Sequence, residues 1–322
     1  MKYLSILFSL VFLFSCKQTK QEKIKEEVQK PEITTKVLDS VNLFAGQLIR
    51  IDSFPTKYIT PRPVDVWLPE NYSSEKKYAV LYMHDGQMLF DETTTWNKQE
   101  WKIDEVASKL MNDGITKDFI VVGIHNIAAI RWLDLYPEKA MKHLTKEELE
   151  IVKSFSNNEV SLKDLTGDEY LQFLVEELKP YIDKTYSVFT NKENTFVAGS
   201  SMGGLMSMYA ISQYPTVFEG AACISTHWVG ARPIKNNPLP KTIFKYLEQN
   251  VPDAKTHKMY FDYGNKTLDQ FYPIHAPKVD SIFLKNGYTE TNFKNLFFED
   301  TDHSEISWQN RIDIPLTFLL KK

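Results

Sequence analysis

The sequence contains very few cysteines. Only Cys16 and Cys223 occur among its 322 residues, so a framework of internal disulfides cannot hold the fold together. Cys223 lies in an apolar run over residues 220–225, where a buried structural thiol is the expected role. The sequence also has no paired C-x-x-C, no H-E-x-x-H and no Walker-type motif. We therefore predict no redox chemistry, no metal and no cofactor.

A concentration of positive charge is also missing. The 38 Lys and Arg residues are outnumbered by 42 Asp and Glu residues, which gives a formal net charge of −4. Proteins that bind nucleic acid usually carry a basic patch for the phosphates. Nucleic acid is therefore not expected as a partner, while the hydrophobic fraction of 43% is ordinary for a globular protein.

No apolar run reaches the roughly 20 residues that a membrane-spanning helix needs. The run over residues 3–14 follows Lys2 and has the length of a signal-peptide core. Leu13-Phe14-Ser15-Cys16 then resembles a bacterial lipoprotein cleavage site, with a plain secretory signal as the alternative. We predict a signal peptide over residues 1–15, a lipid anchor on Cys16 as the only membrane attachment, a polar tether over 16–40 and one folded domain over 41–322. The expected location is the cell envelope or the outside of the cell.

The stretch Gly199-Ser200-Ser201-Met202-Gly203 reads G-x-S-x-G between a β-prone run and an apolar, helix-prone run. A nucleophile on a sharp turn from strand to helix crowds the residues two positions away on each side, so only small residues fit there. We identify Ser201 as the candidate nucleophile. The backbone N–H of Met202, at the start of the helix, is the first candidate oxyanion donor. An ordinary Gly/Ser turn is the alternative.

Strand-like and helix-like runs alternate along the sequence. This pattern predicts an α/β fold with a doubly wound, mostly parallel sheet and helices on both faces, in a single domain. Thr145 and Thr166 each begin a capping-box pattern that predicts the start of a helix. The helix after Thr145 is either a small cap over the site or a surface insertion. Besides the run before Ser201, strands are expected at residues 47–51, 63–68, 78–83, 119–124, 220–225, 258–263 and 295–298.

A serine hydroxyl needs a base, usually a histidine held by a carboxylate, and on such a fold the chain order is Ser, acid, His. His303 follows the last expected strand, where a loop can reach back over Ser201, and is the candidate base. Asp269 lies on the loop after the strand at 258–263 and is preferred as the acid. Asp262, within that strand, is the alternative.

The second oxyanion donor is expected in the loop His84-Asp85-Gly86-Gln87, at the N–H of Gln87 or of Gly86. Asp85 is a candidate substrate contact, with a structural role in holding this loop as the alternative. The other candidate substrate contacts are expected on loops or beside the cleft, where aromatic rings can stack on a sugar or aryl group and a guanidinium can hold a carboxylate. Packing is their alternative role. They are Trp96, Arg131, Trp132, His227 and Trp228.

Several blocks of the sequence together resemble the esterase family of α/β-hydrolases, which includes feruloyl and acetylxylan esterases, siderophore esterases and mycolyltransferases. The resemblance implies an α/β-hydrolase fold and a Ser, Asp, His triad, which falls on Ser201, Asp269 and His303. Residues 139–165 match no block of the family. The matching blocks are residues 82–91, 173–180, 199–204, 225–228 and 302–305, within a resemblance that spans residues 50–320.

These residues and the resemblance predict a serine carboxylic ester hydrolase that acts through an acyl-enzyme intermediate. The expected partners are small-molecule or carbohydrate esters, with acyl or aryl esters of carbohydrates favoured. A siderophore ester, or acyl transfer to a second alcohol, stays open as an outcome of the same chemistry. A catalytically silent glycan-binding lipoprotein is the alternative of another class, and a complete triad argues against it.

Overall fold

A computed structural model describes residues 32–155 and 164–322. Residues 33–322 form one compact unit. The predicted signal peptide, Cys16 and the tether up to residue 31 lie outside the described residues. Within the described ranges, none of the helices has both the length and the apolar composition that crossing a bilayer requires.

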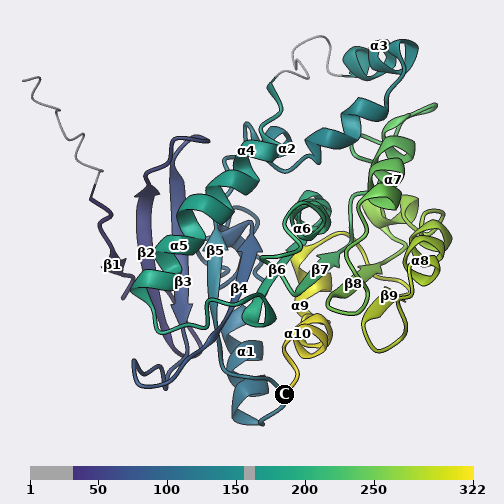
Figure 1. The fold of residues 1–322 in the computed structure, drawn as a ribbon. Helices are drawn as coiled ribbons and strands as arrows, with labels where there is room; N and C mark the ends of the chain where they lie inside the picture. Colours follow the sequence, from purple (N-terminus) through teal and green to yellow (C-terminus); the bar gives the residue numbers. More distant parts are fainter. Residues whose placement is uncertain (1–31, 156–163) are drawn as a thin grey trace, which may run out of the picture. The chain divides into compact units, whose positions relative to one another are not determined.

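One sheet runs through the described part of the chain (Figure 1). Its strands are β1 (Lys36–Val37), β2 (Gln47–Phe54), β3 (Arg62–Leu68), β4 (Ala79–His84), β5 (Phe119–Ile124), β6 (Thr195–Ser200), β7 (Gly220–Ile224), β8 (Lys258–Tyr263) and β9 (Phe293–Phe297). Their order is β1-β2-β3-β5-β4-β6-β7-β8-β9. Strands β4 to β9 pair in parallel, which confirms the mostly parallel sheet. The first three strands add an antiparallel edge that the sequence analysis did not predict, and β1 starts ahead of the boundary expected at residue 41.

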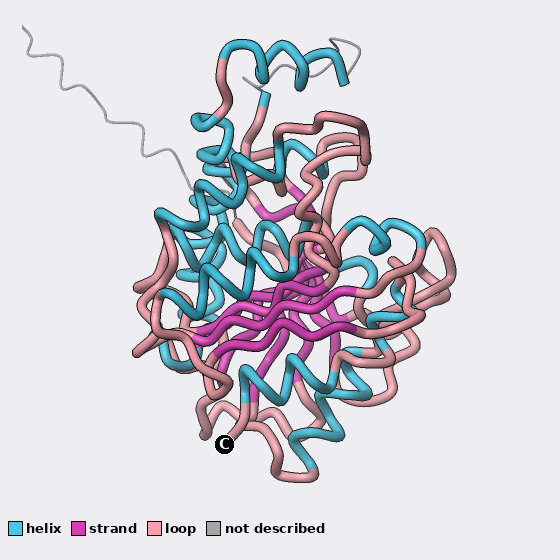
Figure 2. The backbone as a smooth tube through the Cα atoms, turned by 90° about the vertical axis from the view of Figure 1, so that its right-hand side faces the viewer, coloured by secondary structure: helices cyan, strands magenta, loops and turns pink. Residues whose placement is uncertain are grey.

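Helices cover both faces of this sheet, and Figure 2 shows the strands in magenta between cyan helices. On one face lie α1 (Ile103–Asn112), α9 (Glu305–Gln309) and α10 (Asp313–Leu320). On the other lie α4 (Gly167–Gln172), the π-helix η4 (Phe173–Leu178), α5 (Lys179–Thr185), α6 (Met202–Gln213), α7 (Leu239–Gln249) and α8 (Ala276–Lys285). The remaining helical elements are η1 (Gly86–Met88), α2 (Arg131–Asp134), η2 (Glu138–His143), α3 (Lys146–Phe155), η5 (Lys192–Asn194) and η6 (Thr267–Phe271).

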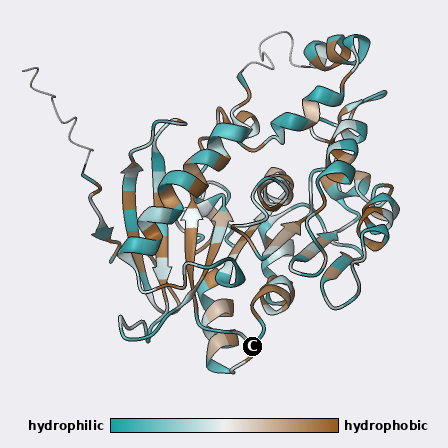
Figure 3. Cartoon of the chain, viewed as in Figure 1, coloured by the Kyte–Doolittle hydropathy of each residue, from teal (hydrophilic) through white to brown (hydrophobic). Residues whose placement is uncertain are grey.

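The central strands β4, β5 and β6 are buried along their whole length and mostly apolar, because each face of the sheet packs against a helical layer. In β4, Val80 and Tyr82 belong to the core that includes α5 and α6, whereas Leu81 and Met83 belong to the core that includes α1 and α10. The outer helices carry both hydrophilic and hydrophobic bands, as helix α5 does in Figure 3. Sheet and helices therefore enclose two separate cores.

The two predicted capping boxes have different outcomes. At α3 the box is formed, because the Glu148 N–H donates to Thr145 Oγ1 (3.2 Å) and the Thr145 N–H donates to Glu148 Oε2 (3.0 Å). At α4 the helix begins directly after Thr166, as predicted, but the box is not formed. The Thr166 hydroxyl donates to the buried Asp134 carboxylate (2.7 Å) and does not cap the helix.

Candidate active site

Ser201 lies at the turn between β6 and α6, with φ 56° and ψ −120°. This positive φ is rare for a residue with a side chain and marks a strained turn. A Cβ added at Gly199 would stand 2.8 Å from the backbone carbon of Gly203, so the turn requires glycine at position 199. The structure therefore contains the sharp turn from strand to helix that the G-x-S-x-G pattern predicts.

The helix that follows Ser201 is buried from Met202 to Ser212. Met202 is its first residue, and the first amides of a helix have no acceptor within the helix. The helix dipole adds a partial positive charge at the same end. The N–H of Met202 is therefore available to an anion that forms beside Ser201.

His303 and Asp269 are brought together from different segments. Nδ1 of His303 lies 2.6 Å from Oδ1 of the fully buried Asp269. The second oxygen of Asp269 accepts hydrogen bonds from the Ser225 hydroxyl (2.7 Å) and the Gly264 N–H (2.7 Å). The imidazole also packs edge-to-face against Trp308, with ring centroids 5.1 Å apart. With Nδ1 engaged by the carboxylate, Nε2 is the nitrogen that remains for proton transfer.

Asp262 lies within β8, as expected, and has other partners. Its carboxylate forms a buried ion pair with Arg311 (3.0 Å) and accepts from the Ser225 N–H (2.9 Å) and the Tyr260 hydroxyl (3.0 Å). Of the two candidate acids, Asp269 is therefore the one in contact with His303.

In the described part of the chain, the Ser201 and His303 side chains form no hydrogen bond with each other, and the His303 ring contacts Asp269 instead. The Tyr272 ring stands edge-to-face to the His303 ring, with centroids 5.9 Å apart. Bonds between catalytic groups often tighten only when substrate is present.

The loop after β4 holds the other expected oxyanion donor. Gln87 is in the short helix η1, whose early amides also have no acceptor within the helix. The loop is fixed by the Asp85 carboxylate, which accepts from Arg131 Nε (2.7 Å), Arg131 Nη2 (2.7 Å) and Asn126 Nδ2 (2.6 Å). Burial raises the pKa of Asp85, but the charge and hydrogen bonds of Arg131 outweigh burial and hold it below its usual value. Asp85 therefore makes the contacts expected if its role is to hold this loop, which was the alternative to a substrate contact.

A family model described as "Putative esterase" matches residues 59–312, which is most of the chain. The chain belongs to this esterase family.

Two curated relatives match about half of this family member. The uncharacterized protein YbbA of Bacillus subtilis is 24% identical over 169 residues, which cover 52% of this chain and 58% of YbbA. An endo-1,4-beta-xylanase/feruloyl esterase of Xylanibacter ruminicola is 26% identical over 185 residues, which cover 56% of this chain and 22% of that protein. The match therefore spans less than two thirds of either relative.

Solved structures share the fold over more of the chain. A ferulic acid esterase superposes with a TM-score of 0.60 at 17% identity and covers 90% of this chain and 99% of its own. The enterobactin esterase FES of Shigella flexneri gives a TM-score of 0.58 at 14% identity, with 87% and 60% covered. At such low identity the likeness shows the α/β-hydrolase fold alone.

Two of the candidate substrate contacts of this esterase family member lie in a helix. Arg131 and Trp132 were expected on a loop, and that expectation is wrong, because both belong to α2. The Arg131–Asp85 pair and a bond from Trp132 Nε1 to the Gly230 carbonyl (2.8 Å) hold this helical turn. The Arg131 side chain keeps 28% of its surface exposed. Its guanidinium is already paired with the Asp85 carboxylate of the same chain, so only this exposed part is open to a substrate.

The remaining candidates differ in exposure. Trp228 is only 5% exposed and stacks on Phe244 with ring centroids 4.8 Å apart, which fits the packing role given as its alternative. His227 is also buried, and its ring nitrogens contact Tyr272 and the Ala231 carbonyl. Trp96 is 84% exposed, on a loop joined to α9 by a bond from the neighbouring Asn97 to Glu305 (2.8 Å). Trp96 is therefore the most exposed of the aromatic candidates, since Trp132 is half-buried and Trp228 is buried.

Several contacts of the site were missed by sequence reasoning. The Ser225 hydroxyl donates to Asp269 and accepts from Trp308 Nε1 (3.0 Å) and Arg311 Nη2 (2.9 Å). Ser225 belongs to the block at 225–228 that carries part of the resemblance, which is the one signal that could have found it. Tyr272, Trp308 and Arg311 belong to no motif.

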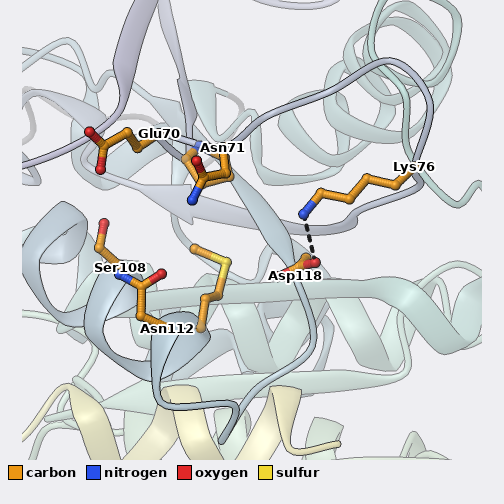
Figure 4. A pocket seen from close by; sticks show the side chains of 8 residues that line it. Glu70, Asn71, Lys76, Ser108, Asn112 and Asp118 are labelled. Atoms are coloured by element: carbon orange, nitrogen blue, oxygen red, sulfur yellow. Dashed lines mark hydrogen bonds and ion pairs between the residues drawn. The ribbon is translucent and has the colours of Figure 1, made fainter.

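Neither of two cavities found among the described residues is lined by Ser201, Asp269 or His303. The first, of about 70 Å³, lies between the end of β3, the start of β5 and α1, where Lys76 pairs with Asp118 (Figure 4). This is the amino end of the parallel strands, opposite to the turn that bears Ser201. The second, of about 130 Å³, is lined by Arg50, Asp65 and Gln87 among others. The first cavity is too far from the nucleophile to be the catalytic pocket.

Proposed function

We propose that this protein is a serine carboxylic ester hydrolase that acts through an acyl-enzyme intermediate. His303 takes the proton from Ser201, whose oxygen attacks the ester carbonyl, and the N–H groups of Met202 and Gln87 hold the oxyanion. His303 then gives the proton to the departing alcohol. Water, activated by the same base, attacks the acyl-enzyme and releases the acid.

The observation that supports this proposal most is the 2.6 Å contact between His303 Nδ1 and Asp269. A buried carboxylate in that position holds the imidazole in the tautomer whose Nε2 can accept a proton, and it stabilises the imidazolium that forms. The positive φ of Ser201 and the free amide of Met202 supply the other two requirements of acyl transfer, a presented nucleophile and an oxyanion donor.

For the substrate we propose acyl or aryl esters of carbohydrates. The exposed ring of Trp96 could stack on a sugar or aryl group, and one relative is named a feruloyl esterase. Within the same chemistry, a siderophore ester is the second candidate, because the fold is shared with an enterobactin esterase. Comparing hydrolysis rates for acetyl, feruloyl and siderophore esters separates the two, and acyl transfer would appear as an ester product when a second alcohol is added.

We also propose that the chain is exported and held at a membrane through a lipid on Cys16. This rests on the signal-like run over residues 3–14 and the lipoprotein-like residues before Cys16.

A chromogenic short-chain ester tests the proposed chemistry. Wild type should hydrolyse it, and Ser201→Ala should lose roughly 10⁶-fold in kcat, as expected when a working triad loses its nucleophile. Ser212→Ala is the matched control, because it removes a hydroxyl from the same helix without touching the site, and its rate should stay within a few-fold of wild type. Equal background rates in wild type and Ser201→Ala would instead favour the silent glycan-binding protein.

A further inference from the structure

The hydroxyl of Ser225 contacts three side chains, one of which is the candidate acid. Ser225 directly follows β7 and is fully buried. Its Oγ lies 2.7 Å from Asp269 Oδ2, 3.0 Å from Trp308 Nε1 and 2.9 Å from Arg311 Nη2. In the reaction as proposed above, Ser225 has no role.

The direction of each of these hydrogen bonds follows from the chemistry of the partners. An indole N–H and a guanidinium can only donate, so the Ser225 oxygen accepts from both Trp308 and Arg311. A hydroxyl has one hydrogen and two lone pairs. Both lone pairs are then occupied, and the hydrogen is donated to the Asp269 carboxylate. The three bonds together therefore fix the direction in which the Ser225 O–H points.

The backbone of Ser225 is fixed as well. Its N–H donates to Asp262 Oδ1 (2.9 Å), and the same carboxylate pairs with Arg311 (3.0 Å). The φ of Ser225 is 40°, a value that residues with a side chain rarely adopt. Backbone strain of this kind persists only where the surrounding contacts enforce it, and it is common at functional sites. The contacts with Asp262 and Arg311 therefore hold Ser225 in a strained turn whose hydroxyl meets Asp269.

Two donors determine which oxygen of Asp269 faces His303. The Oδ2 atom accepts from the Ser225 hydroxyl (2.7 Å) and from the Gly264 N–H (2.7 Å), and Oδ1 is left for His303 Nδ1 (2.6 Å). A carboxylate can turn about its bond to Cβ, and the two donors on Oδ2 oppose that rotation. Because Gly264 contributes a backbone amide, the Ser225 hydroxyl is the side-chain group that fixes the carboxylate.

We propose that Ser225, oriented by Trp308 and Arg311, is a positioning residue that holds the Asp269 carboxylate toward His303. The inference rests on the proposed function, because it assumes that His303 is the base of the reaction and Asp269 its acid. Ser225 acts only through Asp269, whose orientation keeps Nε2 of His303 ready to accept the serine proton. An effect of Ser225 on turnover must therefore depend on the carboxylate at position 269.

A double-mutant cycle on kcat for a chromogenic short-chain ester tests this dependence. Ser225→Ala should lower kcat about 10- to 100-fold in the wild-type background, the size expected from one lost hydrogen bond to a charged group. In the Asp269→Asn background the same change should alter kcat by no more than about three-fold, because the amide already selects the wrong tautomer of His303 and orienting it no longer helps. A purely structural role predicts the same fold loss in both backgrounds.

Two further variants complete the design. Ser225→Gly removes the same hydroxyl and relieves the strain of the positive φ, so it replaces Ser225→Ala if the alanine variant does not fold. Thr226→Val is the matched control, because it removes a neighbouring buried hydroxyl that donates to the Cys223 carbonyl (2.8 Å). Its kcat should stay within a few-fold of wild type.

An equal loss in both backgrounds overturns the inference, and so does an unchanged kcat in a folded variant without the Ser225 hydroxyl. Ser201→Ala keeps the two proposals apart. If Ser201→Ala hydrolyses the ester as fast as wild type, the proposed function itself fails. If Ser201→Ala is inactive and the cycle shows no dependence on Asp269, only the role of Ser225 fails.

Discussion

The carboxylates of Asp262 and Asp269 are both buried, but they have different partners and therefore different expected roles. Asp269 contacts His303, whereas Asp262 neutralises Arg311 and accepts the Ser225 N–H. A buried charge left without its partner costs far more than a lost surface contact. Removing one carboxylate should therefore affect turnover, and removing the other should affect stability.

Asp269→Asn should lower kcat on a chromogenic ester by about 10⁴-fold, because an amide no longer selects the tautomer of His303 that accepts the serine proton. Asp262→Asn should instead reduce the free energy of unfolding by about 3–5 kcal/mol, because Arg311 stays buried and unpaired. Turnover and urea unfolding are measured on both variants. A stable, inactive Asp262→Asn beside an active Asp269→Asn would assign the acid to Asp262.

The main chemical residues could be predicted from the sequence because each follows a strand in a fixed order along the chain. Ser201 lies in a glycine-framed turn, and His303 and Asp269 come after later strands. Tyr272, Trp308 and Arg311 could not be found in this way. Their roles depend on contacts across the fold, such as the bond between Trp308 and Ser225, which no local spacing encodes.

Two short helices, η1 and α2, meet through the Asp85–Arg131 pair. This bidentate contact fixes the loop that carries the Gln87 N–H, although Arg131 also has exposed surface that could face a substrate. A lysine keeps the charge but cannot form the two parallel bonds. The loop would then be free to shift, and a displacement of about 1 Å in a catalytic group can cost about 10² in rate.

Arg131→Lys should therefore lower kcat by up to about 10²-fold and leave KM nearly unchanged, for a neutral ester and for a carboxylate-bearing ester alike. Steady-state kinetics measures kcat and KM of the variant and the wild type on both esters. The neutral ester is the control for the carboxylate-bearing one. A rise in KM confined to the carboxylate-bearing ester would show that Arg131 binds substrate.

Helix α1 begins with a buried acid whose charge the fold disfavours. Asp104 Oδ2 accepts from the Phe44 N–H (2.6 Å), while Oδ1 has no partner in the described part of the chain. Burial and then the charge of Glu105 raise the pKa of Asp104 to about 8. The folded state thus binds this proton more tightly than the unfolded chain, whose aspartates titrate near 4. The contribution of Asp104 to stability is complete below about pH 4 and is lost as the pH rises through about 8.

Asp104→Asn should remove this loss, because an amide is neutral at every pH. Urea unfolding at pH 6 and pH 9 measures this. The free energy of unfolding should fall less between these two pH values in the variant than in wild type. Asp113→Asn is the control, since that carboxylate lies at the other end of α1, is 45% exposed and pairs with Lys109. Equal decreases in wild type and Asp104→Asn would contradict the assignment.

Among the elements, the central strands were the most predictable. A strand that is buried on both faces needs a nearly continuous run of apolar residues, and such a run is visible in the sequence. Helix α2 was missed because its single turn is held by distant partners, Asp85 and Gly230. The antiparallel pairing of β1 to β3 was missed for a similar reason, since alternation shows that a strand exists but not which neighbour it joins.

For the molecule as a whole, the sequence predicts attachment to a membrane through one residue. Cys16→Ser should move the protein from the membrane fraction to the soluble fraction of the producing cells, because the lipid is the only expected anchor. Fractionation and incorporation of labelled palmitate measure the change, with Cys223→Ser as the control. Equal membrane association of Cys16→Ser and wild type would rule out the anchor.

Helix α6 has protein on every side from Met202 to Ser212. It cannot separate from its surroundings without exposing both its own apolar surface and the strands beneath it, so its amide hydrogens should exchange with solvent only when the entire unit opens. Ser201, which directly precedes this helix, therefore lies beside one of the least mobile parts of the molecule. A movement that brings Ser201 and His303 into hydrogen-bonding contact is then expected from the loop between β9 and α9, which carries His303 and lies outside that helix.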